Sequence, residues 1–291
     1  MEIDWKTKLF CLIGHPVSKS LSPNIHNEFY KINNLDNVYL VFDIKEENFE
    51  DIIYSFKIMD VQGFNITIPH KIRIINYLDE ISNEAKLIGA VNTVKNENGK
   101  LIGYNTDGLG FIKSLKDNNI NIKDKNILIL GSGGAANAIS TSLALDNVKK
   151  LYINNRSIAK SKKLAIKIKK QFPDIDIEYG NLSLNNIKKE KIHMIINCTS
   201  VGMYPNTEEV PIFLEGFNRN LIVYDIIYKP EKTNFLKLAE EKGYYTINGL
   251  PMLINQALYS QAIWLNQDFK NIFKNFEEIR RSLEIYVEQY N

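Results

Sequence analysis

A glycine-rich segment in the middle of the chain contains residue types that bind phosphate groups. The run NILILGSGGAANAIS passes from an apolar stretch through Gly131, Gly133 and Gly134 into a series of small residues. A strand, a glycine turn and a helix in this order form the context of a dinucleotide fingerprint, because Gly131 permits a tight turn and Gly133 lets the backbone approach a pyrophosphate. The N-terminus of the following helix would face that anion. An ordinary strand-to-helix turn is the alternative interpretation.

The next expected strand is followed by cationic and neutral side chains. NAD-dependent enzymes usually place an Asp or Glu at this point, where it accepts a hydrogen bond from the ribose 2′-hydroxyl. The segment LYINNRSIAK places Asn155, Arg156, Ser157 and Lys160 there instead. A guanidinium binds a 2′-phosphate through paired hydrogen bonds. The pattern therefore favours NADP(H) over NAD(H), with a solvated basic turn as the alternative.

Two serines precede an expected helix near the N-terminus. In GHPVSKSLSPNIHN, a strand is expected to end at Gly14 and a helix to start near Ser22, with Pro23 at its first position. Ser22 has the residue type of a helix cap. Ser20 and Ser22 together also offer two hydroxyl groups to a carboxylate at the positive end of that helix.

Further polar side chains follow other apolar runs. GFNITIPHK contains Thr67 and Lys71, GAVNT contains Asn92, and YNTDG contains Asp107. Taken alone, a surface lysine and a turn aspartate are the simpler interpretations of these segments. NGLPMLINQA, close to the C-terminus, places Gln256 on an expected helix.

The elements that would position these residues alternate along the chain between short apolar runs and amphipathic stretches. This alternation is typical of an α/β fold with parallel strands. Strands are expected at 8–13, 38–43, 61–68, 90–94, 127–130, 151–154, 194–197 and 221–224. Helices are expected at 22–30, 135–144, 158–170 and 233–242.

Length and composition limit the classes of function. A chain of 291 residues is long enough for two domains, and 44% hydrophobic with 24% charged residues is a globular composition. The balance of 36 Lys and Arg against 34 Asp and Glu argues against nucleic-acid or anionic-membrane binding, and favours a small-molecule partner. Without a long apolar run or a signal segment, a cytoplasmic protein is expected.

The cysteines and histidines give no indication of a metal site or a disulfide. Cys11 and Cys198 lie in apolar runs that resemble strands, which suits reduced and packed thiols. The histidines lack the spacing of metal ligands, so no metal is expected.

Nine motifs occur in the order found in shikimate dehydrogenases: SxSP, NxTxPxK, GAxNT, YNTDG, GxGGAA, NRS, NxTxxGM, YDxxYxP and GxxMLxxQA. The chain resembles that family along nearly its whole length. The resemblance implies reversible, NADPH-dependent reduction of 3-dehydroshikimate to shikimate in the chorismate pathway of aromatic amino-acid biosynthesis. It also implies an N-terminal α/β substrate domain of residues 1–106 and 251–291, a Rossmann-type NADP-binding domain of residues 107–250, and a cleft between them. The family contains both monomers and dimers, so the resemblance leaves a monomer and a homodimer as alternative assemblies.

The resemblance also implies roles for individual residues, with Lys71 and Asp107 at the reacting carbon. The implied substrate-binding residues are Ser20, Ser22, Thr67, Lys71, Asn92, Asp107, Tyr228 and Gln256. The implied cofactor-binding residues are Gly131, Ser132, Gly133, Gly134, Ala135, Ala136, Asn155, Arg156, Ser157, Lys160, Ile226 and Gly249. Two alternative functions stay open beside this assignment: a quinate/shikimate dehydrogenase and a non-catalytic NADP-binding regulator.

Ketone reduction needs a hydride at carbon and a proton, or a strong hydrogen bond, at the developing alkoxide. We expect Lys71 to polarise the carbonyl and to pass the proton. Asp107 is expected to orient Lys71 and to bind the adjacent substrate hydroxyl.

Overall fold

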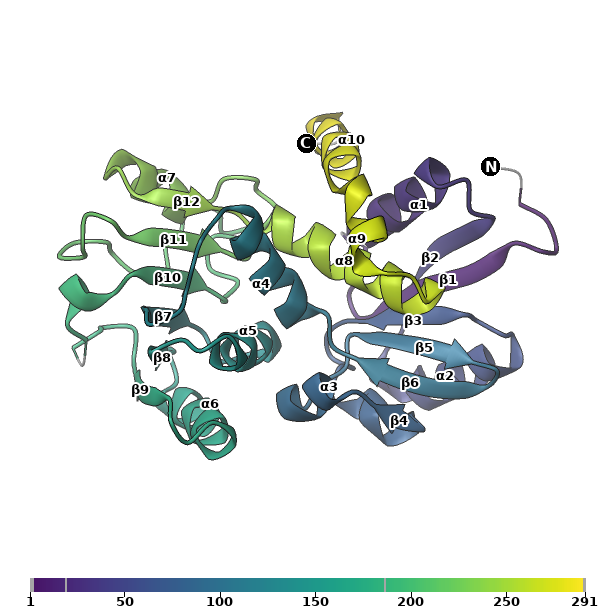
Figure 1. The fold of residues 1–291 in the computed structure, drawn as a ribbon, viewed down its shortest axis with the longest axis horizontal. Helices are drawn as coiled ribbons and strands as arrows, with labels where there is room; N and C mark the ends of the chain where they lie inside the picture. The colour runs from purple at the N-terminus through teal and green to yellow at the C-terminus, as the bar shows by residue number, and fades with distance from the viewer. Residues whose placement is uncertain (1–2, 19, 186, 290–291) are drawn as a thin grey trace. The chain divides into compact units, whose positions relative to one another are not determined.

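The structure is a computed structural model that describes residues 3–18, 20–185 and 187–289. The chain divides into two compact units, drawn together in Figure 1. The first unit contains the residues up to Gly110 and those from Ile254 onward, and the second unit is Phe111–Leu253. The chain passes from one unit to the other within two helices, α4 (Asp107–Asp117) and α8 (Leu250–Leu265).

The first unit is built on a mixed sheet with the strand order β2-β1-β3-β5-β6-β4. Its strands are β1 (Lys8–Gly14), β2 (Asn37–Asp43), β3 (Gly63–Ile66), β4 (Glu80–Ile81), β5 (Thr93–Glu97) and β6 (Lys100–Tyr104). β1 pairs in parallel with β2 and β3, whereas β5 runs antiparallel to β3 and β6. Besides α8, its helices are α1 (Ser22–Ile32), α2 (Phe49–Ile58), α3 (Asn83–Ile88), α9 (Phe269–Ile272) and α10 (Phe276–Gln289).

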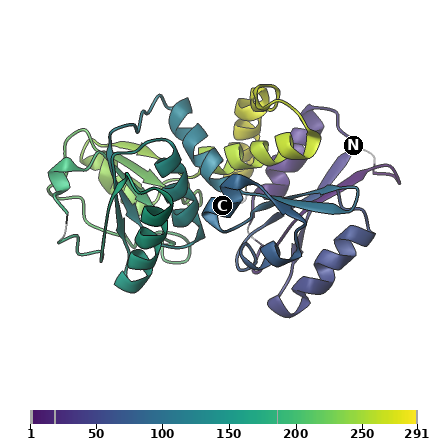
Figure 2. The same cartoon turned by 60° about the horizontal axis from the view of Figure 1, so that its bottom comes forward.

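Helices cover both faces of this first sheet, because successive side chains of a strand point to opposite faces. Cys11 of β1 lies in a hydrophobic cluster with Phe56 of α2. The ring of its neighbour Phe10 instead lies 5.7 Å from the ring of Tyr30 in α1 and 5.0 Å from that of Trp264 in α8. Figure 2 shows α2 on one side of the sheet and the yellow C-terminal helices on the other.

The second unit contains a parallel sheet with the strand order β12-β11-β10-β7-β8-β9. Its strands are β7 (Asn126–Leu130), β8 (Lys150–Asn154), β9 (Asp176–Gly180), β10 (Met194–Asn197), β11 (Ile222–Asp225) and β12 (Tyr245–Ile247). Counted from β7, this is the doubly wound order of a Rossmann fold, which confirms the expected fold class. The order reverses between β7 and β10, and ligands of such sheets bind beyond the carboxyl ends of the strands at this point.

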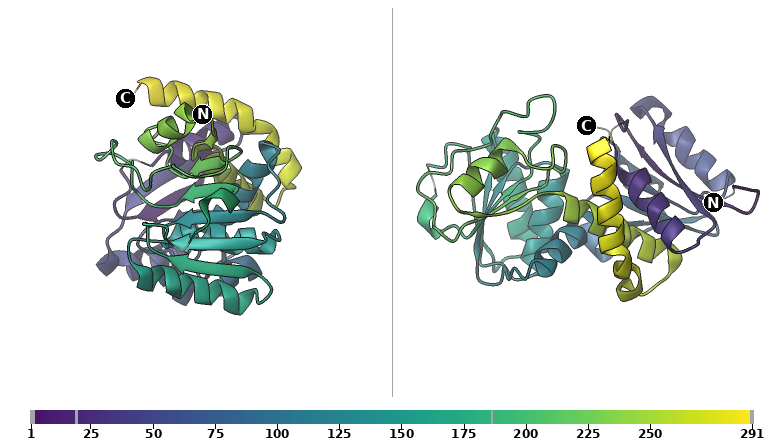
Figure 3. Two further views of the ribbon diagram at one scale, coloured as in Figure 1. Left: turned by 90° about the vertical axis from the view of Figure 1, so that its left-hand side faces the viewer. Right: turned by 90° about the horizontal axis from the view of Figure 1, so that it is seen from above.

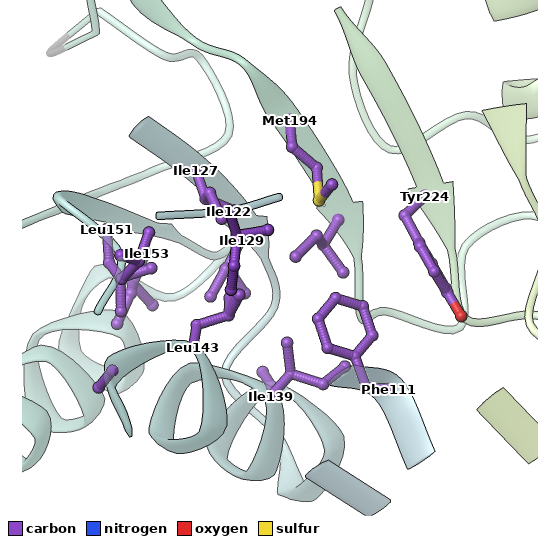
Figure 4. Close-up of a cluster of buried hydrophobic side chains, with 14 of the residues drawn as sticks. Phe111, Ile122, Ile127, Ile129, Ile139, Leu143, Leu151, Ile153, Met194 and Tyr224 are labelled. Atoms are coloured by element: carbon purple, nitrogen blue, oxygen red, sulfur yellow. The ribbon is translucent and has the colours of Figure 1, made fainter. Parts of the chain in front are cut away.

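The core of the second unit also has two sides. Ile129 of β7 packs with Phe111 of α4 and Ile139 of α5 (Gly134–Leu145), as Figure 4 shows. Leu128 points to the opposite face, where it joins a cluster that contains Phe235 of α7 (Asn234–Glu241). The right-hand view of Figure 3 shows α7 in light green and α5 in teal on opposite sides of the sheet. The remaining helix, α6 (Ile158–Gln171), packs on the α5 side.

Several elements differ from the expected ones. The strand expected at 90–94 starts at Thr93 and pairs with β6, which was not expected. The turn between them contains Asn98 and Gly99, both with positive φ, and an Asn-Gly pair of this kind is a strong hairpin signal. The short strands β4, β9 and β12 were also not expected. Cys198 follows β10 rather than lying inside a strand, although it and Cys11 are both free thiols.

No helix in the described part of the chain is long and apolar enough to cross a membrane.

Candidate active site

Lys71 and Asp107 form an ion pair in the first unit, with 2.5 Å between Lys71 Nζ and Asp107 Oδ2. Their side chains are 22% and 13% exposed, so water reaches the pair only in part. Lys71 lies in the turn that follows β3, and its carbonyl oxygen accepts a hydrogen bond from the backbone N–H of Val91. Asp107 is the first residue of α4, where the helix dipole favours a carboxylate.

The side chain of Asn92 fixes the Asp107 carboxylate from the other side. Asn92 Nδ2 donates to Asp107 Oδ1 at 2.8 Å and to Thr106 Oγ1 at 2.9 Å. Asn92 Oδ1 accepts from the backbone N–H of Thr106 at 2.8 Å. These contacts define the orientation of the amide, since its donors and its acceptor each have a partner. One carboxylate oxygen of Asp107 is thus held by Asn92, and the other contacts Lys71.

Asn65 links Asn92 to the interior of the first unit. Asn65 Nδ2 lies 3.1 Å from the carbonyl oxygen of Asn92, 3.0 Å from Thr93 Oγ1 and 3.1 Å from Ser260 Oγ. Its Oδ1 accepts a hydrogen bond of 2.7 Å from the hydroxyl of Tyr39. All five side chains are buried, so this network replaces the water that such groups would otherwise bind.

Ser20 and Ser22 lie close together, but Ser22 is not the helix cap that was expected. Ser22 is itself the first residue of α1 and is preceded by Leu21, which has no polar group to cap the helix. The backbone N–H of Ser22 donates to Ser20 Oγ at 3.2 Å, and the two hydroxyl oxygens are 3.1 Å apart. Burial raises the pKa of Tyr39, and a hydrogen bond with Ser22 partly opposes that shift. The serine pair therefore lies near Tyr39, whose hydroxyl donates to Asn65.

Gln256 lies at the margin of the same network, and Thr67 directly follows β3. Thr106 Oγ1 is 3.5 Å from Gln256 Oε1, and Ser260, one turn further along α8, donates to the carbonyl oxygen of Gln256. The backbone N–H of Thr67 donates to the carbonyl oxygen of Ile13 at the end of β1. The structure thus brings Lys71, Asn92, Asp107 and Gln256 together in one network, and it brings Ser20 and Ser22 together as a separate pair.

The glycine-rich turn after β7 leaves space for a ligand. Gly131 has a φ of 110°, and a Cβ there would lie 3.1 Å from the carbonyl oxygen of Cys198. At Gly133 and Gly134, an added Cβ would meet no described atom within 4 Å beyond the adjacent residues and the backbone of α5 itself. No side chain among the described residues caps the first turn of α5, so its N–H groups suit a phosphate. Ala136 is buried in the core below.

The turn after β8 lies next to this glycine turn, because Leu130 of β7 pairs in register with Asn154 of β8. Asn155 Nδ2 donates to the carbonyl oxygen of Ser157. Arg156, Ser157 and Lys160 are exposed, so a bulky anionic group can reach them. Ser132 in the glycine turn and Ala135 in the first turn of α5 are half-buried. The residues proposed for the 2′-phosphate and the pyrophosphate therefore share one edge of the sheet.

The turns after β11 and β12 meet at the same edge. A Cβ on Gly249 would lie only 1.9 Å from the carbonyl oxygen of Ile226, so this contact requires glycine. The backbone N–H of Gly249 donates to the carbonyl oxygen of Ile227 at 3.0 Å. Tyr228 is half-buried, and burial raises its pKa. Tyr228, expected to reach the substrate, lies in the second unit with the expected cofactor residues.

Several members of the first-unit network were not predicted from the sequence. Thr93 and Thr106 could have been found, because they lie within the GAxNT and YNTDG motifs. Tyr39 and Ser260 carry no such signal, since each is a common residue in an ordinary strand or helix. Among the described residues, no three His, Cys, Asp or Glu side chains are grouped as a metal site would need.

Models of two known protein families match the chain. The family described as shikimate dehydrogenase substrate binding domain matches residues 12–94, and that described as shikimate / quinate 5-dehydrogenase matches residues 113–223. A shikimate dehydrogenase (NADP(+)) of Methanococcus aeolicus is 48% identical over 276 residues, which cover 94% of this chain and 98% of the relative.

Solved structures show the same similarity. A crystal structure of a shikimate dehydrogenase in complex with NADP+ superimposes with a TM-score of 0.88 at 42% identity, and the match covers 96% of this chain and 98% of that one. The shikimate 5-dehydrogenase of Listeria monocytogenes, in complex with shikimate and NAD, gives a TM-score of 0.87 at 36% identity. That match covers 95% of this chain and 98% of the other.

Proposed function

The chain belongs to the shikimate dehydrogenase family, and we propose that Lys71 and Asp107 are the residues at which it carries out the family's reaction. It is an NADP-dependent oxidoreductase that acts on a CH–OH group and interconverts 3-dehydroshikimate and shikimate. One observation supports the residue assignment above all others: the partly shielded ion pair with 2.5 Å between Lys71 Nζ and Asp107 Oδ2.

The proposed chemistry follows from the donors and acceptors of this pair. Bound NADPH supplies the hydride to the carbonyl carbon. The ammonium group of Lys71 donates a hydrogen bond to the carbonyl oxygen and transfers its proton as that oxygen becomes an alkoxide. Asp107 can only accept hydrogen bonds when ionised, so it orients Lys71 and accepts one from an adjacent substrate hydroxyl. In the reverse direction Lys71 takes the proton back from the alcohol.

The other first-unit residues are proposed to bind the substrate. Ser20 and Ser22 place two hydroxyl groups near the positive end of α1, which suits the substrate carboxylate. Thr67, Asn92 and Gln256 are proposed to bind the ring oxygens together with Lys71 and Asp107. Tyr228 is proposed to reach the substrate. Under this proposal the substrate domain comprises residues 1–106 and 251–291.

Residues 107–250 are the proposed cofactor domain. The open space at Gly133 and Gly134, together with the uncapped start of α5, supports pyrophosphate binding by residues 131–136. The exposed guanidinium of Arg156 supports recognition of the 2′-phosphate, assisted by Asn155, Ser157 and Lys160. Ile226 and Gly249 are proposed to line the nicotinamide.

The proposal includes a cytoplasmic location, supported by the two free thiols of Cys11 and Cys198, which suit a reducing compartment. It also includes a homodimer as the assembly to be tested. Sedimentation of the purified protein distinguishes this dimer from a monomer.

The test is an absorbance assay at the NADPH band with 3-dehydroshikimate, run beside NADH and beside quinate with NAD. We expect oxidation of NADPH that depends on 3-dehydroshikimate, and much slower turnover in the other two reactions. Faster turnover of quinate with NAD would identify a quinate/shikimate dehydrogenase instead. NADPH binding without any turnover would contradict the enzymatic function and favour a regulator.

A further inference from the structure

Two sequence motifs, NxTxxGM and YDxxYxP, contain residues that the proposed function does not use. In the structure, Asn197 of the first motif ends β10, and Asp225 of the second motif ends the neighbouring strand β11. The two residues pair in register. Both side chains are 0% exposed.

The buried carboxylate of Asp225 accepts hydrogen bonds from three donors. Asp225 Oδ1 accepts from Asn197 Nδ2 and from the backbone N–H of Ile227, each at 3.1 Å. Asp225 Oδ2 accepts from Thr233 Oγ1 at 2.7 Å. Burial raises the pKa of Asp225 to about 6, while these three hydrogen bonds counteract the rise, so the group is mainly ionised at neutral pH. A buried charge is tolerated only where such partners compensate it.

Each donor belongs to a different segment at the carboxyl edge of the sheet. Asn197 also holds the turn after β10, because its Oδ1 accepts from the N–H and the hydroxyl of Thr199 and its Nδ2 lies 3.3 Å from the carbonyl oxygen of Val201. Ile227 belongs to the turn after β11. Thr233 caps α7 by accepting from the N–H of Leu236. One carboxylate thus joins two turns and a helix start.

The turn after β11 is held from a second direction by Gly249, whose backbone lies against the carbonyl group of Ile226. Ile226 and Tyr228 are the two side chains of this turn that the proposed function uses. The residue between them, Ile227, donates its N–H to Asp225 and accepts from the N–H of Gly249 through its carbonyl oxygen. The position of Ile226 and Tyr228 therefore depends directly on Asp225.

The strand order indicates which half of the cofactor this turn serves. Arg156, proposed for the 2′-phosphate of the adenosine half, follows β8 on one side of the point where the order reverses. β10 and β11 lie on the other side of that point. In a doubly wound sheet the two halves of a dinucleotide bind to the two halves of the sheet.

We propose that Asp225, together with Asn197 and Thr233, is a positioning residue that sets the turns after β10 and β11 for the nicotinamide half of NADP(H). This inference rests on the proposed function, because it assumes that the nicotinamide binds beside Ile226 and Tyr228. Asp225 does not contact the reacting atoms and acts only through the segments that it holds. Its loss would leave three buried donors without their acceptor and would release both turns.

The test compares Asp225→Asn with Asp174→Asn, an exposed carboxylate of the same unit. Binding of NADPH is measured by its fluorescence, and binding of adenosine 2′,5′-bisphosphate, which lacks the nicotinamide, by competition. We expect Asp225→Asn to raise the Kd for NADPH about 10-fold and to lower kcat about 10²-fold, as a misplacement of about 1 Å does. The Kd for the bisphosphate should stay within about twofold, and Asp174→Asn should change none of these values.

Thr233 provides an independent pair of variants. Thr233→Val removes a donor to Asp225 and should weaken NADPH binding selectively, whereas Thr233→Ser keeps the hydroxyl and should restore it. These variants decide the question if Asp225→Asn does not fold. Unchanged NADPH binding and kcat, or equal weakening of NADPH and the bisphosphate, would overturn the proposal. Absence of turnover in the unmodified protein would overturn the proposed function alone, since the binding comparison needs no turnover.

Discussion

Asn92 Nδ2 donates to Asp107 Oδ1 at 2.8 Å, while Lys71 Nζ contacts the other oxygen of the same carboxylate. The carboxylate is therefore oriented before any substrate binds, and its orientation sets that of the ammonium group. Preorganised hydrogen bonds of this kind contribute to catalysis because they need no rearrangement during the reaction.

Replacement of Asn92 should test this orientation. In Asn92→Ala the Asp107 carboxylate loses its amide donor, and we expect kcat to fall about 10²-fold, the effect of a misplaced catalytic group. Steady-state kinetics with 3-dehydroshikimate provide the measurement. Asn24→Ala on α1 serves as the control, and equal kcat values for the two variants would argue against a role of Asn92 in orienting Asp107.

Arg156→Ala should alter the choice of cofactor. The exposed guanidinium is proposed to bind the 2′-phosphate, which NADH lacks, so the variant should bind NADPH about 10-fold or more weakly and NADH almost unchanged. Fluorescence titration with both nucleotides measures the two Kd values. Equal losses for NADPH and NADH would mean that Arg156 does not recognise the 2′-phosphate.

Two glycines should respond differently to an added methyl group. Gly133→Ala meets open space, so the free energy of unfolding should change little while NADPH binding weakens, because a methyl group would occupy the phosphate site. Gly249→Ala meets a backbone oxygen at 1.9 Å and should destabilise the protein by about 2 kcal/mol. Urea unfolding measures both variants, and the opposite order of stability would contradict the geometry described for these turns.

Asp225 should impose a pH dependence on stability. Its pKa is raised from 3.8 to about 6, so between these values the native state binds the proton more tightly than the unfolded chain does. The contribution of this group to the free energy of unfolding therefore decreases as pH rises from about 4 to about 6, by up to about 3 kcal/mol, and is constant above that range.

The comparison of Asp225→Asn with the unmodified protein isolates this effect. Urea unfolding at several pH values should show that the stability of the unmodified protein relative to the variant falls between pH 4 and 6. Asp174→Asn, at an exposed site, should give a constant difference. A constant difference for Asp225→Asn as well would show that Asp225 titrates alike in the folded and unfolded protein.

The sequence allowed the fold class, the family and the cofactor to be predicted, and all three are confirmed. The glycine segment was informative because it joins a strand to a helix within one short run. The roles of Lys71 and Asp107 stay predictions. Neither residue type is distinctive, and only the order of the motifs singled them out.

Other features depend on contacts that one sequence does not display. Asn65 meets Ser260 across 195 positions of the chain, and no local pattern in either segment indicates that contact. The role of Ser22 was misjudged because a serine before an apolar run is commonly a helix cap. In the structure, Ser22 is already the first residue of α1, so the cap position falls on Leu21. Asp225 belongs to the YDxxYxP motif, but only the pairing of β11 with β10 explains the burial of its side chain.

The most direct test of the proposed chemistry is the single-turnover rate of hydride transfer from saturating NADPH to 3-dehydroshikimate in Lys71→Ala. The control is Lys31→Ala, which removes a lysine that is 76% exposed on α1. We predict that the rate in Lys71→Ala is about 10²–10⁴-fold lower than in the control, the usual effect of losing a positioned acid, with NADPH binding unchanged. Equal rates in the two variants would contradict the assignment of Lys71 to the reacting carbonyl.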